Sequence, residues 1–463
     1  MAKDIRQLLL DRGSLEGSTI YFIGIGGIGM SALARFFKDK KADVQGYDRH
    51  RSILCAALEQ EGIGIHYEDS LELLRKDADI VVYTPAIPKD MQELNFYRQG
   101  NYKLVKRSEI LEWITEPTFN ICIGGTHGKS TITALVAHIL RHSGYGCNAF
   151  LGAISVDYNT NFWASDRAVS VVEADEFDRS FLRLSPDVAV ITAMDADHLD
   201  IYGTEEKVQE AFVQFSQRIR KGGCLVSKKG LAKEAGLSAD FHFTYSLDNA
   251  GADYRLQKIA VENGAYKYDV VTPGGHVLRD VVIHLGGYHN VENSIAAIAV
   301  ARFLKIEDSA VKAAIAAFKG VKRRFEYVVR NEQHVLIDDY AHHPAEIEAL
   351  LKGVRSLFRQ KMTVVFQPHL YSRTRDLADG FAKSLDHGDE VLLLPVYPAR
   401  ELPMEGVSSE LILDKMQLKD KAVLSKEAML EKIKSEKPGL VVVCGAGDID
   451  ELVKPIKEIL ERR

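Results

Sequence analysis

The sequence predicts an α/β protein of three consecutive domains, each built around a parallel sheet. Two observations predict this fold class. Apolar strand-like runs alternate with helical patterns along most of the chain, which is typical of doubly wound sheets. In addition, glycine-rich corners follow two of these strands, at residues 24–29 and 124–131. The length of 463 residues agrees with about three domains of ordinary size.

The composition excludes several classes of protein. With 46% hydrophobic and 27% charged residues the chain is predicted to be globular, and no apolar run is long enough to cross a bilayer. The net charge is -6 with dispersed basic residues, which argues against nucleic-acid binding. The N-terminus lacks a secretory signal, and five scattered cysteines without a CxxC pair favour the reducing cytoplasm. We expect a cytoplasmic monomer or weak dimer without nucleic-acid or membrane partners.

The first domain is predicted from a strand, a glycine-rich corner and a helix. The strand covers residues 18–25, and a second strand at residues 43–47 ends at an acidic residue. Glycine lets the backbone approach a diphosphate at the positive helix N-terminus. A Rossmann-like fingerprint is therefore formed by Gly24, Gly26, Gly27, Gly29 and Asp48. It fits NAD, another nucleotide diphosphate, or a turn without ligand. A strand at residues 78–84 follows, and we end this domain at residue 106.

The second domain begins with a phosphate-binding loop. A strand at residues 119–123 runs into GGTHGKST and then a helix, the order of elements in a P-loop ATPase. Converging backbone amides and Lys129 suit phosphate oxygens, and the hydroxyl of Ser130 suits Mg. The usual longer spacing would need glycine at position 123, where this chain has isoleucine. The alternative is a glycine turn that only joins strand to helix.

Carboxylates and a histidine follow the next two strands of this domain. Glu173 ends a strand at residues 169–172, and His198 follows a strand at residues 188–192. The carboxyl ends of parallel strands meet at one edge of a sheet, so both residues are predicted to lie on the rim that carries Ser130. The sequence therefore predicts Mg ligation by Ser130, Glu173 and His198. Solvated acidic loops are the alternative.

The remainder of the second domain contains a helix and small strands. Residues 205–220 are predicted to be helical, and short runs in residues 254–285 predict small strands that form an appended meander rather than core sheet. Asn290 and Asn293 then open an alanine-rich helix. Because they are three residues apart they share a face and can hydrogen-bond an adenine edge. Asn290 could instead only cap the helix.

The third domain is predicted to start after residue 321. Arg324 lies at this boundary, where its planar guanidinium could reach a γ-phosphate or form a salt bridge. Strands alternate with helices again, which predicts a parallel, Rossmann-like sheet. Polar residues crowd the loops that follow these strands, at residues 335–337, 363–366, 390–394 and 440–444.

Taken together and in order, these motifs resemble the Mur ligases over essentially the whole chain. The segments that carry the resemblance are GIGGIGMSALA, GTHGKST, EADEFD, DADHLD, HNVEN, RRFE, DDYAHHP and QPHLYSRTRD. The last two, with VYPAR, are most similar to the members that add L-alanine. The resemblance implies an ATP- and Mg-dependent ligase that joins L-alanine to the carboxylate of UDP-N-acetylmuramate through an acyl phosphate, in peptidoglycan synthesis. It also implies three domains, at residues 1–106 (UDP-sugar), 107–321 (ATP) and 322–463 (amino acid).

The resemblance also implies roles for individual residues. The first glycine corner and Asp48 would hold the UDP-sugar and not NAD. ATP would be bound by Gly125, Thr126, His127, Gly128, Lys129, Ser130, Thr131, Asn290, Asn293, Arg324 and Asp339. Catalysis would depend on Lys129, Glu173, His198 and Arg324. L-alanine would be held by Tyr340, His342, His369 and Arg373, with Arg373 best suited to its carboxylate.

The sequence differs from the family pattern at two places, and it leaves three alternative functions open. Ala193 stands where relatives usually carry asparagine, and residues 208–220 contain no lysine that could be carbamylated. A ligase that recycles murein peptides would load a tripeptide onto the same sugar nucleotide. An NAD-dependent dehydrogenase with an NTPase domain, and a non-catalytic ATP-switched binding protein, are the rivals from other classes.

Overall fold

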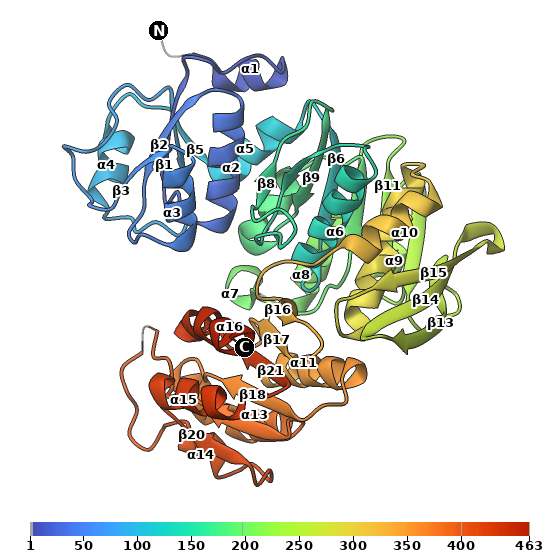
Figure 1. Cartoon of the computed structure of the whole chain (residues 1–463). Helices are drawn as coiled ribbons and strands as arrows, with labels where there is room; N and C mark the ends of the chain where they lie inside the picture. Colours follow the sequence, from blue (N-terminus) through green and yellow to red (C-terminus); the bar gives the residue numbers. More distant parts are fainter. Residues whose placement is uncertain (1–2, 197, 400, 463) are drawn as a thin grey trace. The chain divides into compact units, whose positions relative to one another are not determined.

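A computed structural model describes residues 3–196, 198–399 and 401–462 (Figure 1). Asp197 and Arg400, which belong to two of the quoted motifs, therefore lie outside the described residues. The chain forms two compact units. The first consists of Met1–Gln257, Asp269–Arg279 and Glu292–Ile315, and the second of Lys258–Tyr268, Asp280–Val291 and Ala316–Arg463. Among the described helices, none is long and apolar enough to cross a membrane.

The first sheet has five parallel strands in the order β3-β2-β1-β4-β5. Its predicted strands are confirmed to within two residues at each end. The strands are β1 (Thr19–Ile23), β2 (Asp43–Tyr47), β3 (Gly64–His66), β4 (Ile80–Tyr83) and β5 (Leu104–Lys106). The helices of this part are α1 (Ile5–Leu10), α2 (Ile28–Asp39), α3 (Ile53–Gln60), α4 (Gln92–Gln99) and α5 (Arg107–Thr115).

The second sheet has ten strands in the order β15-β14-β13-β12-β11-β10-β6-β9-β7-β8. Its centre is β6 (Phe119–Gly124), flanked by β9 (Val169–Glu173) and β10 (Val188–Ile191), all parallel. The other strands are β7 (Asn148–Phe150), β8 (Phe162–Trp163), β11 (Cys224–Lys228), β12 (Phe241–Ser246), β13 (Tyr254–Glu262), β14 (Ala265–Val271) and β15 (Val277–Ile283). The main helices are α6 (Lys129–His142), α7 (Leu199–Tyr202), α8 (Glu205–Ser216), α9 (Tyr288–Phe303) and α10 (Asp308–Ala317).

The predicted appended meander is confirmed: β13, β14 and β15 follow one another in chain order at one edge of this sheet. β13 continues the sheet through parallel pairing with β12, where Tyr245 pairs with Tyr254 and Ser246 with Arg255. The two strands pair over only this short stretch, so the meander is joined to the rest of the sheet by few backbone contacts. The predicted helix at residues 205–220 ends earlier than expected, at Ser216.

The third sheet has six strands in the order β16-β17-β21-β18-β19-β20. The strands are β16 (Glu326–Arg330), β17 (Val335–Asp339), β18 (Met362–Phe366), β19 (Glu390–Leu393), β20 (Lys421–Val423) and β21 (Leu440–Cys444). The four strands from which the parallel sheet was predicted, β17, β21, β18 and β19, are confirmed as parallel, and β20 joins them in the same direction. β16 is an added edge strand that pairs with β17 in the antiparallel direction. The helices are α11 (Pro344–Leu357), α12 (Tyr371–Asp376), α13 (Ala378–Leu385), α14 (Glu410–Leu413), α15 (Lys426–Glu436) and α16 (Val453–Glu461).

One hydrophobic core joins the first sheet's helices to the second sheet. Phe36 of α2 packs against Phe150 and Phe162, with ring centroids 5.6 Å and 6.0 Å apart. Figure 1 shows α2 lying beside β8. A buried polar contact accompanies this core, because Arg35 donates to the side chain of Asn161, whose amide in turn donates to Ile28 O at 2.6 Å. The helix α2 of the first sheet therefore packs against strands of the second sheet within this unit.

A buried carboxylate in the first sheet gives a pH prediction. Glu93 is fully buried and accepts a hydrogen bond of 2.6 Å from Tyr21. Burial raises the pKa of Glu93 from 4.5 to about 7, so the folded state loses stability as pH rises from about 4.5 to about 7 and loses no more above that. Glu93→Gln should remove this loss, on the order of 3 kcal/mol at pH 8, because its carbonyl oxygen still accepts from Tyr21. Urea unfolding at pH 5 and pH 8 measures the difference, with exposed Glu72→Gln as control. Equal gains at both pH values would contradict the prediction.

Candidate active site

The predicted phosphate-binding loop connects β6 to α6. Gly125 and Gly128 adopt φ of +131° and +80°, and Gly128 precedes the first turn of α6. A Cβ atom at Gly125 would collide with Thr192 Oγ1 and lie 2.9 Å from the backbone nitrogen of Ala193. The loop is also tied to the end of β10, since the Thr126 N–H donates to Ala193 O at 3.2 Å. Only the backbone of residue 193 makes this contact, so alanine is tolerated there.

The other loop residues differ in exposure. Thr131 and Ser130 are buried in the first turn of α6, while His127 is exposed and lies 3.6 Å from Asp195. The helix is fourteen residues long, so its N-terminus offers unpaired N–H groups and partial positive charge to an anion. The loop has the backbone geometry that a phosphate group requires.

Lys129 forms a buried ion pair that the sequence did not predict. Its Nζ donates to Gly125 O and to Glu176 Oε1, both at 2.7 Å. Glu176 is fully buried, and Tyr202 donates to its backbone oxygen at 2.7 Å. Burial raises the pKa of Glu176, while the charge of Lys129 acts in the opposite direction. Glu176 therefore holds the lysine at the loop.

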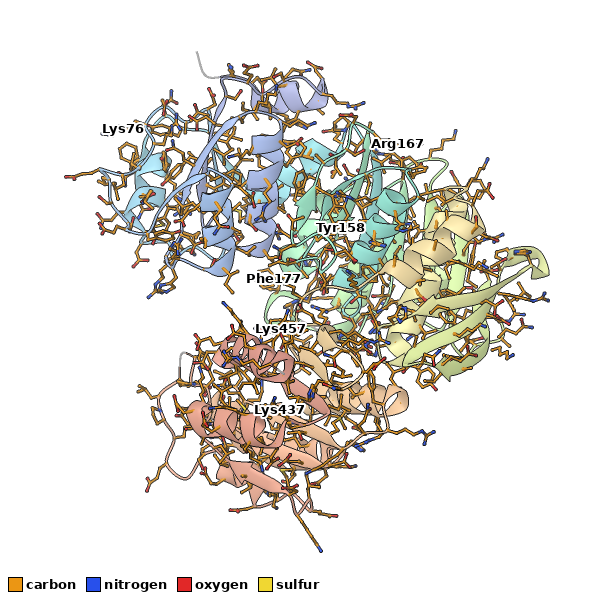
Figure 2. All side chains as sticks on the ribbon, in the orientation of Figure 1. Lys76, Tyr158, Arg167, Phe177, Lys437 and Lys457 are labelled. Carbon is orange, nitrogen blue, oxygen red and sulfur yellow. The ribbon has the colours of Figure 1, made fainter. Side chains whose placement is uncertain are left out.

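Two of the three predicted metal ligands lie together. Ser130 Oγ donates to Glu173 Oε1 at 3.1 Å, where β9 ends beside the loop. His198, with φ of +50°, packs its ring against Phe177, with centroids 5.1 Å apart (Phe177 is labelled in Figure 2). No group of three or more His, Cys, Asp or Glu side chains suited to a metal occurs among the described residues. A hydroxyl and a carboxylate are hard oxygen donors that suit Mg, and ligation by His198 stays a prediction.

Gly125→Ala tests the loop geometry. We expect the free energy of unfolding to fall by roughly 3 kcal/mol or more, because the added methyl group meets Thr192 in addition to the strain at positive φ. Gly144→Ala is the matched control, since Gly144 has φ of +75° but nothing within 4 Å of an added Cβ. Urea unfolding measures both. Equal losses for the two variants would show that the contact with Thr192 does not constrain the loop.

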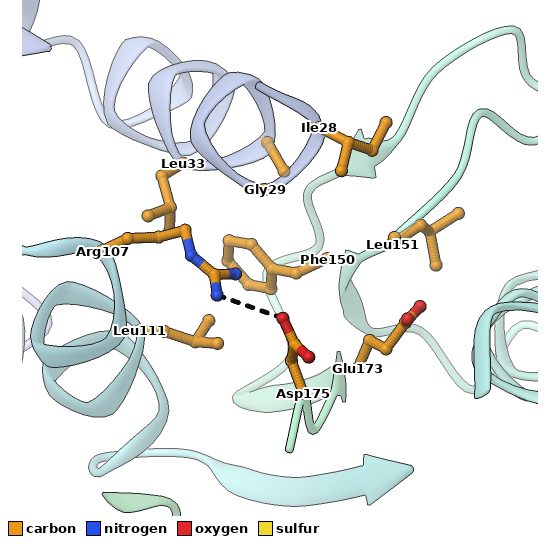
Figure 3. A pocket seen from close by; sticks show the side chains of 11 residues that line it. Ile28, Gly29, Leu33, Arg107, Leu111, Phe150, Leu151, Glu173 and Asp175 are labelled. Carbon is orange, nitrogen blue, oxygen red and sulfur yellow. Dashed lines mark hydrogen bonds and ion pairs between the residues drawn. The ribbon is translucent and has the colours of Figure 1, made fainter. Parts of the chain in front are cut away.

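A cavity of about 120 Å³ joins the first glycine corner to the end of β9 (Figure 3). Gly29 lies on one side and Glu173 and Asp175 on the other, and Arg107 bridges them through a 3.4 Å contact with Asp175. A Cβ atom at Gly29 would lie 2.8 Å from Arg107 Nη1, so a larger residue there would displace this guanidinium. The first glycine corner and the EADEFD segment thus line one cavity within the first unit. Arg107 adds a cation to this cavity that no sequence motif indicated.

The rest of the first corner is tightly organised. Gly24 has φ of +85°, and the Gly26 N–H donates to Asp48 Oδ2 at 2.8 Å. A Cβ atom at Gly26 would collide with Cys55 Sγ, whereas Gly27 has room for one. The carboxylate of Asp48 therefore helps to fix the backbone of the glycine corner. The contact of Asp48 with a ribose remains a prediction.

The two predicted adenine ligands lie in the first turns of α9. Asn293 is buried, with Oδ1 2.9 Å from the position of a Cβ at Gly128. Asn290 is buried as well, and its amide donates to Gly286 O at 2.7 Å. Because α9 begins at Tyr288, Asn290 lies inside the helix, so the alternative of simple helix capping was wrong.

In the second unit, the segment before β16 presents Arg324. Arg323 and Phe325 both have positive φ, and Arg324 between them is exposed. Arg323 donates to Gly445 O at 2.6 Å, and Asp339 accepts from the backbone of Phe325 at 2.7 Å. Desolvation raises the pKa of Asp339 to about 6. These contacts of Arg323 and Phe325 fix the backbone at Arg324. Asp339 holds the segment through the N–H of Phe325, and its contact with ATP stays a prediction.

The four residues predicted for L-alanine lie near one another in the second unit. Tyr340 and His342 have ring centroids 5.1 Å apart, and His342 and His369 have centroids 6.3 Å apart. Burial, and then the charge of Arg373, lower the pKa of His369. Arg373 Nη1 and His369 Nδ1 are buried atoms without a hydrogen-bond partner among the residues that the structure describes. A polar ligand at this place would satisfy both.

The backbone beside these residues is strained in a way that the sequence did not predict. Leu370 adopts φ of +70°, and its N–H donates to Tyr397 O at 2.9 Å. Tyr397 also stacks on His369, with centroids 5.7 Å apart. Such strain costs about 1–3 kcal/mol and is concentrated at functional sites.

Comparison with known families agrees with this arrangement. The model of the Mur ligase family catalytic domain matches residues 19–117, that of the Mur ligase middle domain residues 123–301, and that of the Mur ligase glutamate ligase domain residues 323–447.

Curated relatives and solved structures match over nearly the full length. The UDP-N-acetylmuramate–L-alanine ligase of Flavobacterium johnsoniae is 45% identical, with 95% of this chain and 97% of the relative covered. The enzyme of the same name from Porphyromonas gingivalis is 46% identical, with 96% and 99% covered. The crystal structure of UDP-N-acetylmuramate-alanine ligase from Thermotoga maritima matches with a TM-score of 0.81, 29% identity, and 95% and 98% coverage. A murein peptide ligase from Psychrobacter arcticus shares the fold, with a TM-score of 0.64, 21% identity, and 96% and 99% coverage. By its motifs, its fold and its full-length relatives, the chain belongs to the Mur ligase family.

Proposed function

We propose that this protein is an ATP-dependent ligase that forms an amide between L-alanine and the carboxylate of UDP-N-acetylmuramate, a step in peptidoglycan synthesis. The observation that carries the proposal is similarity over 95–96% of the chain, at 44–46% identity, to enzymes named for this reaction. The murein peptide ligase, which represents the rival function, is only 21% identical.

The assignment of substrates follows the three predicted domains. Residues 1–106 would bind the UDP-sugar through the first glycine corner, residues 107–321 would bind ATP, and residues 322–463 would bind L-alanine. The cavity between Gly29 and Glu173 supports the first two assignments, because it would bring an acid held by the first corner to the phosphate-binding loop. Arg373 supports the third, because its buried Nη1 has no partner among the residues that the structure describes and a carboxylate is its natural partner.

The phosphate-binding loop would perform the activation step. A carboxylate is unreactive until one oxygen becomes part of a leaving group, so the γ-phosphoryl group of ATP is transferred to it, giving an acyl phosphate and ADP. Lys129 and Arg324 would stabilise the charge on the transferred group, mainly by position and electrostatics. Mg, held by Ser130, Glu173 and His198, would supply further charge neutralisation.

The amine of L-alanine then attacks the acyl carbon, the amide forms and phosphate leaves. The amine must lose a proton, and His198 and His342 are the candidate bases. His342 is better suited, because its Nδ1 lies 2.9 Å from Tyr340 O and a proton donated there leaves Nε2 as an acceptor. A histidine that binds a metal would be a poor base.

A single assay tests the proposal. Purified protein is incubated with ATP, Mg and UDP-N-acetylmuramate, and phosphate release is measured with L-alanine, with the tripeptide substrate of the recycling ligases, or with neither. We expect release only with L-alanine. Release with the tripeptide alone would support the rival ligase, and the absence of release together with NAD binding would overturn the proposal.

A further inference from the structure

Arg324 is the middle residue of a strained backbone segment. Arg323 and Phe325 have φ of +59° and +51°, in the left-handed region that costs a residue other than glycine about 1–3 kcal/mol. Neither residue type favours this region. Two strained residues on either side of Arg324 persist only because other contacts hold the segment, and these contacts show what the segment is held against.

The side chain of Arg323 contacts the ends of two strands of the third sheet. Its Nη2 donates to the backbone oxygen of Gly445, which follows β21, at 2.6 Å. Its Nε lies 3.9 Å from Asp338 Oδ2 in β17, and its Nη1 lies 3.4 Å from Asp450 Oδ2. Because β17 and β21 are adjacent parallel strands, Arg323 spans the carboxyl ends of both (Figure 1).

Arg323 also holds Tyr340, one of the residues predicted to bind L-alanine. The N–H of Tyr340 donates to Arg323 O at 2.7 Å. The guanidinium of Arg323 lies over the Tyr340 ring, 5.0 Å from its centroid, which is within the range of a cation–π interaction. Arg323 is thus joined to Arg324 through the chain, and to Tyr340 through both its backbone and its side chain.

These contacts are not those that would stabilise the fold best. Asp338 is only 3% exposed, and its Oδ1 and the Nε of Arg323 are buried atoms without a hydrogen-bond partner among the residues that the structure describes. Each unsatisfied buried group costs about 1–3 kcal/mol. Burial raises the pKa of Asp338 to about 7, while the charge of Arg323 acts in the opposite direction. A well-packed apolar pair often stabilises a fold as well as a buried ion pair, so stability alone does not account for Arg323.

We propose that Arg323 is a positioning residue of the ligase reaction, which holds Arg324 and Tyr340 in one fixed arrangement at the end of the third sheet. This inference rests on the proposed function, in which Arg324 acts on the transferred phosphoryl group and Tyr340 contacts L-alanine. Arg323 touches neither substrate itself. It keeps the cation and the ring in register with each other, and a misplacement of about 1 Å in such a site can lower the rate by about 100-fold.

Steady-state phosphate release at varied L-alanine tests the inference. The informative variant is Arg323→Met/Asp338→Asn, because the second change removes the buried carboxylate that the first would leave without its charged partner. We expect kcat to fall by about tenfold or more and the KM for L-alanine to rise by about tenfold. Arg330→Met is the matched control: Arg330 lies over Tyr327 at 4.6 Å and donates to Gly264 O at 3.2 Å, at the far end of β16 from Arg323. The control should leave both constants unchanged. If either constant were unchanged in the double variant, the inference would be wrong.

A second comparison separates positioning from a merely structural role. If Arg323 acts on kcat through Arg324, the two losses should not multiply. Arg324→Met added to the double variant should therefore give the kcat of Arg324→Met alone, within about twofold, the usual error of additive effects. A merely structural role would lower kcat again by the factor seen in the double variant, and that result would contradict the inference.

Amide hydrogen exchange without substrates measures the positioning itself. The N–H groups of Phe325 and Tyr340 donate to Asp339 Oδ2 and to Arg323 O, both at 2.7 Å. Both should exchange about tenfold faster in the double variant and at the unaltered rate in Arg330→Met. Unchanged exchange in the double variant, together with L-alanine-dependent phosphate release by the unaltered protein, would overturn the role of Arg323 alone. An unaltered protein that releases no phosphate with L-alanine would instead overturn the proposed function.

Discussion

Lys129→Met should lower the rate of ATP-dependent phosphate release by about 10³-fold or more, because the cation nearest the transferred phosphoryl group is lost. The same change leaves Glu176 buried without its charged partner, which was 2.7 Å away. We therefore expect the free energy of unfolding at pH 8 to fall as well, by about 3 kcal/mol. Phosphate release and urea unfolding measure the two effects.

The control for this prediction is Lys129→Met/Glu176→Gln. Replacing the carboxylate removes the uncompensated buried charge, so stability should recover while phosphate release stays low. This separates loss of chemistry from loss of fold. Near-normal turnover in Lys129→Met would show that the loop of residues 125–131 is not the site of phosphoryl transfer.

Arg373→Met should raise the KM for L-alanine by about 100-fold, because a charge-assisted contact to the amino-acid carboxylate is worth roughly 1.5–3 kcal/mol. The KM for ATP should change little. Steady-state phosphate release at varied L-alanine measures the effect. Arg375→Met is the matched control: Arg375 lies two residues away, is exposed and pairs with Asp376 at 2.7 Å.

Arg373→Lys refines the same test. Lysine keeps the charge but lacks the planar fork, so we expect the KM for L-alanine to stay at least about tenfold above that of the unaltered protein. If instead Arg373→Met and Arg375→Met had equal effects, Arg373 would not contact the amino acid, and its buried Nη1 would need another explanation.

The features that the sequence predicted well are encoded locally. The strand, glycine corner and helix at Gly24 and at Gly128 follow from short segments, because positive φ and the start of a helix depend on a few neighbouring residues. The ends of β2 and β21 were predicted to the residue for the same reason. The closeness of Ser130 and Glu173 followed from the rule that parallel strands end at one edge.

The features that the sequence did not predict depend on contacts between distant segments. Glu176 was part of a recognised motif, but its pairing with Lys129 spans 47 residues. Arg107 reaches Asp175 across 68 residues, and nothing in its own neighbourhood indicates a cavity. The strain at Leu370 falls on a residue type that gives no local signal of positive φ. The antiparallel pairing of β16 is the exception, because it is a local hairpin in which a short turn joins β16 to β17.

The common core of the first and second sheets has a practical consequence for anyone who dissects this protein. Expression of residues 1–106 alone would leave Phe36 of α2 without Phe150 and Phe162, and Arg35 without Asn161. A truncated product of that length would expose a large hydrophobic patch to water and would aggregate into inclusion bodies. A soluble fragment that still binds a sugar nucleotide would have to retain β7, β8 and β9 as well.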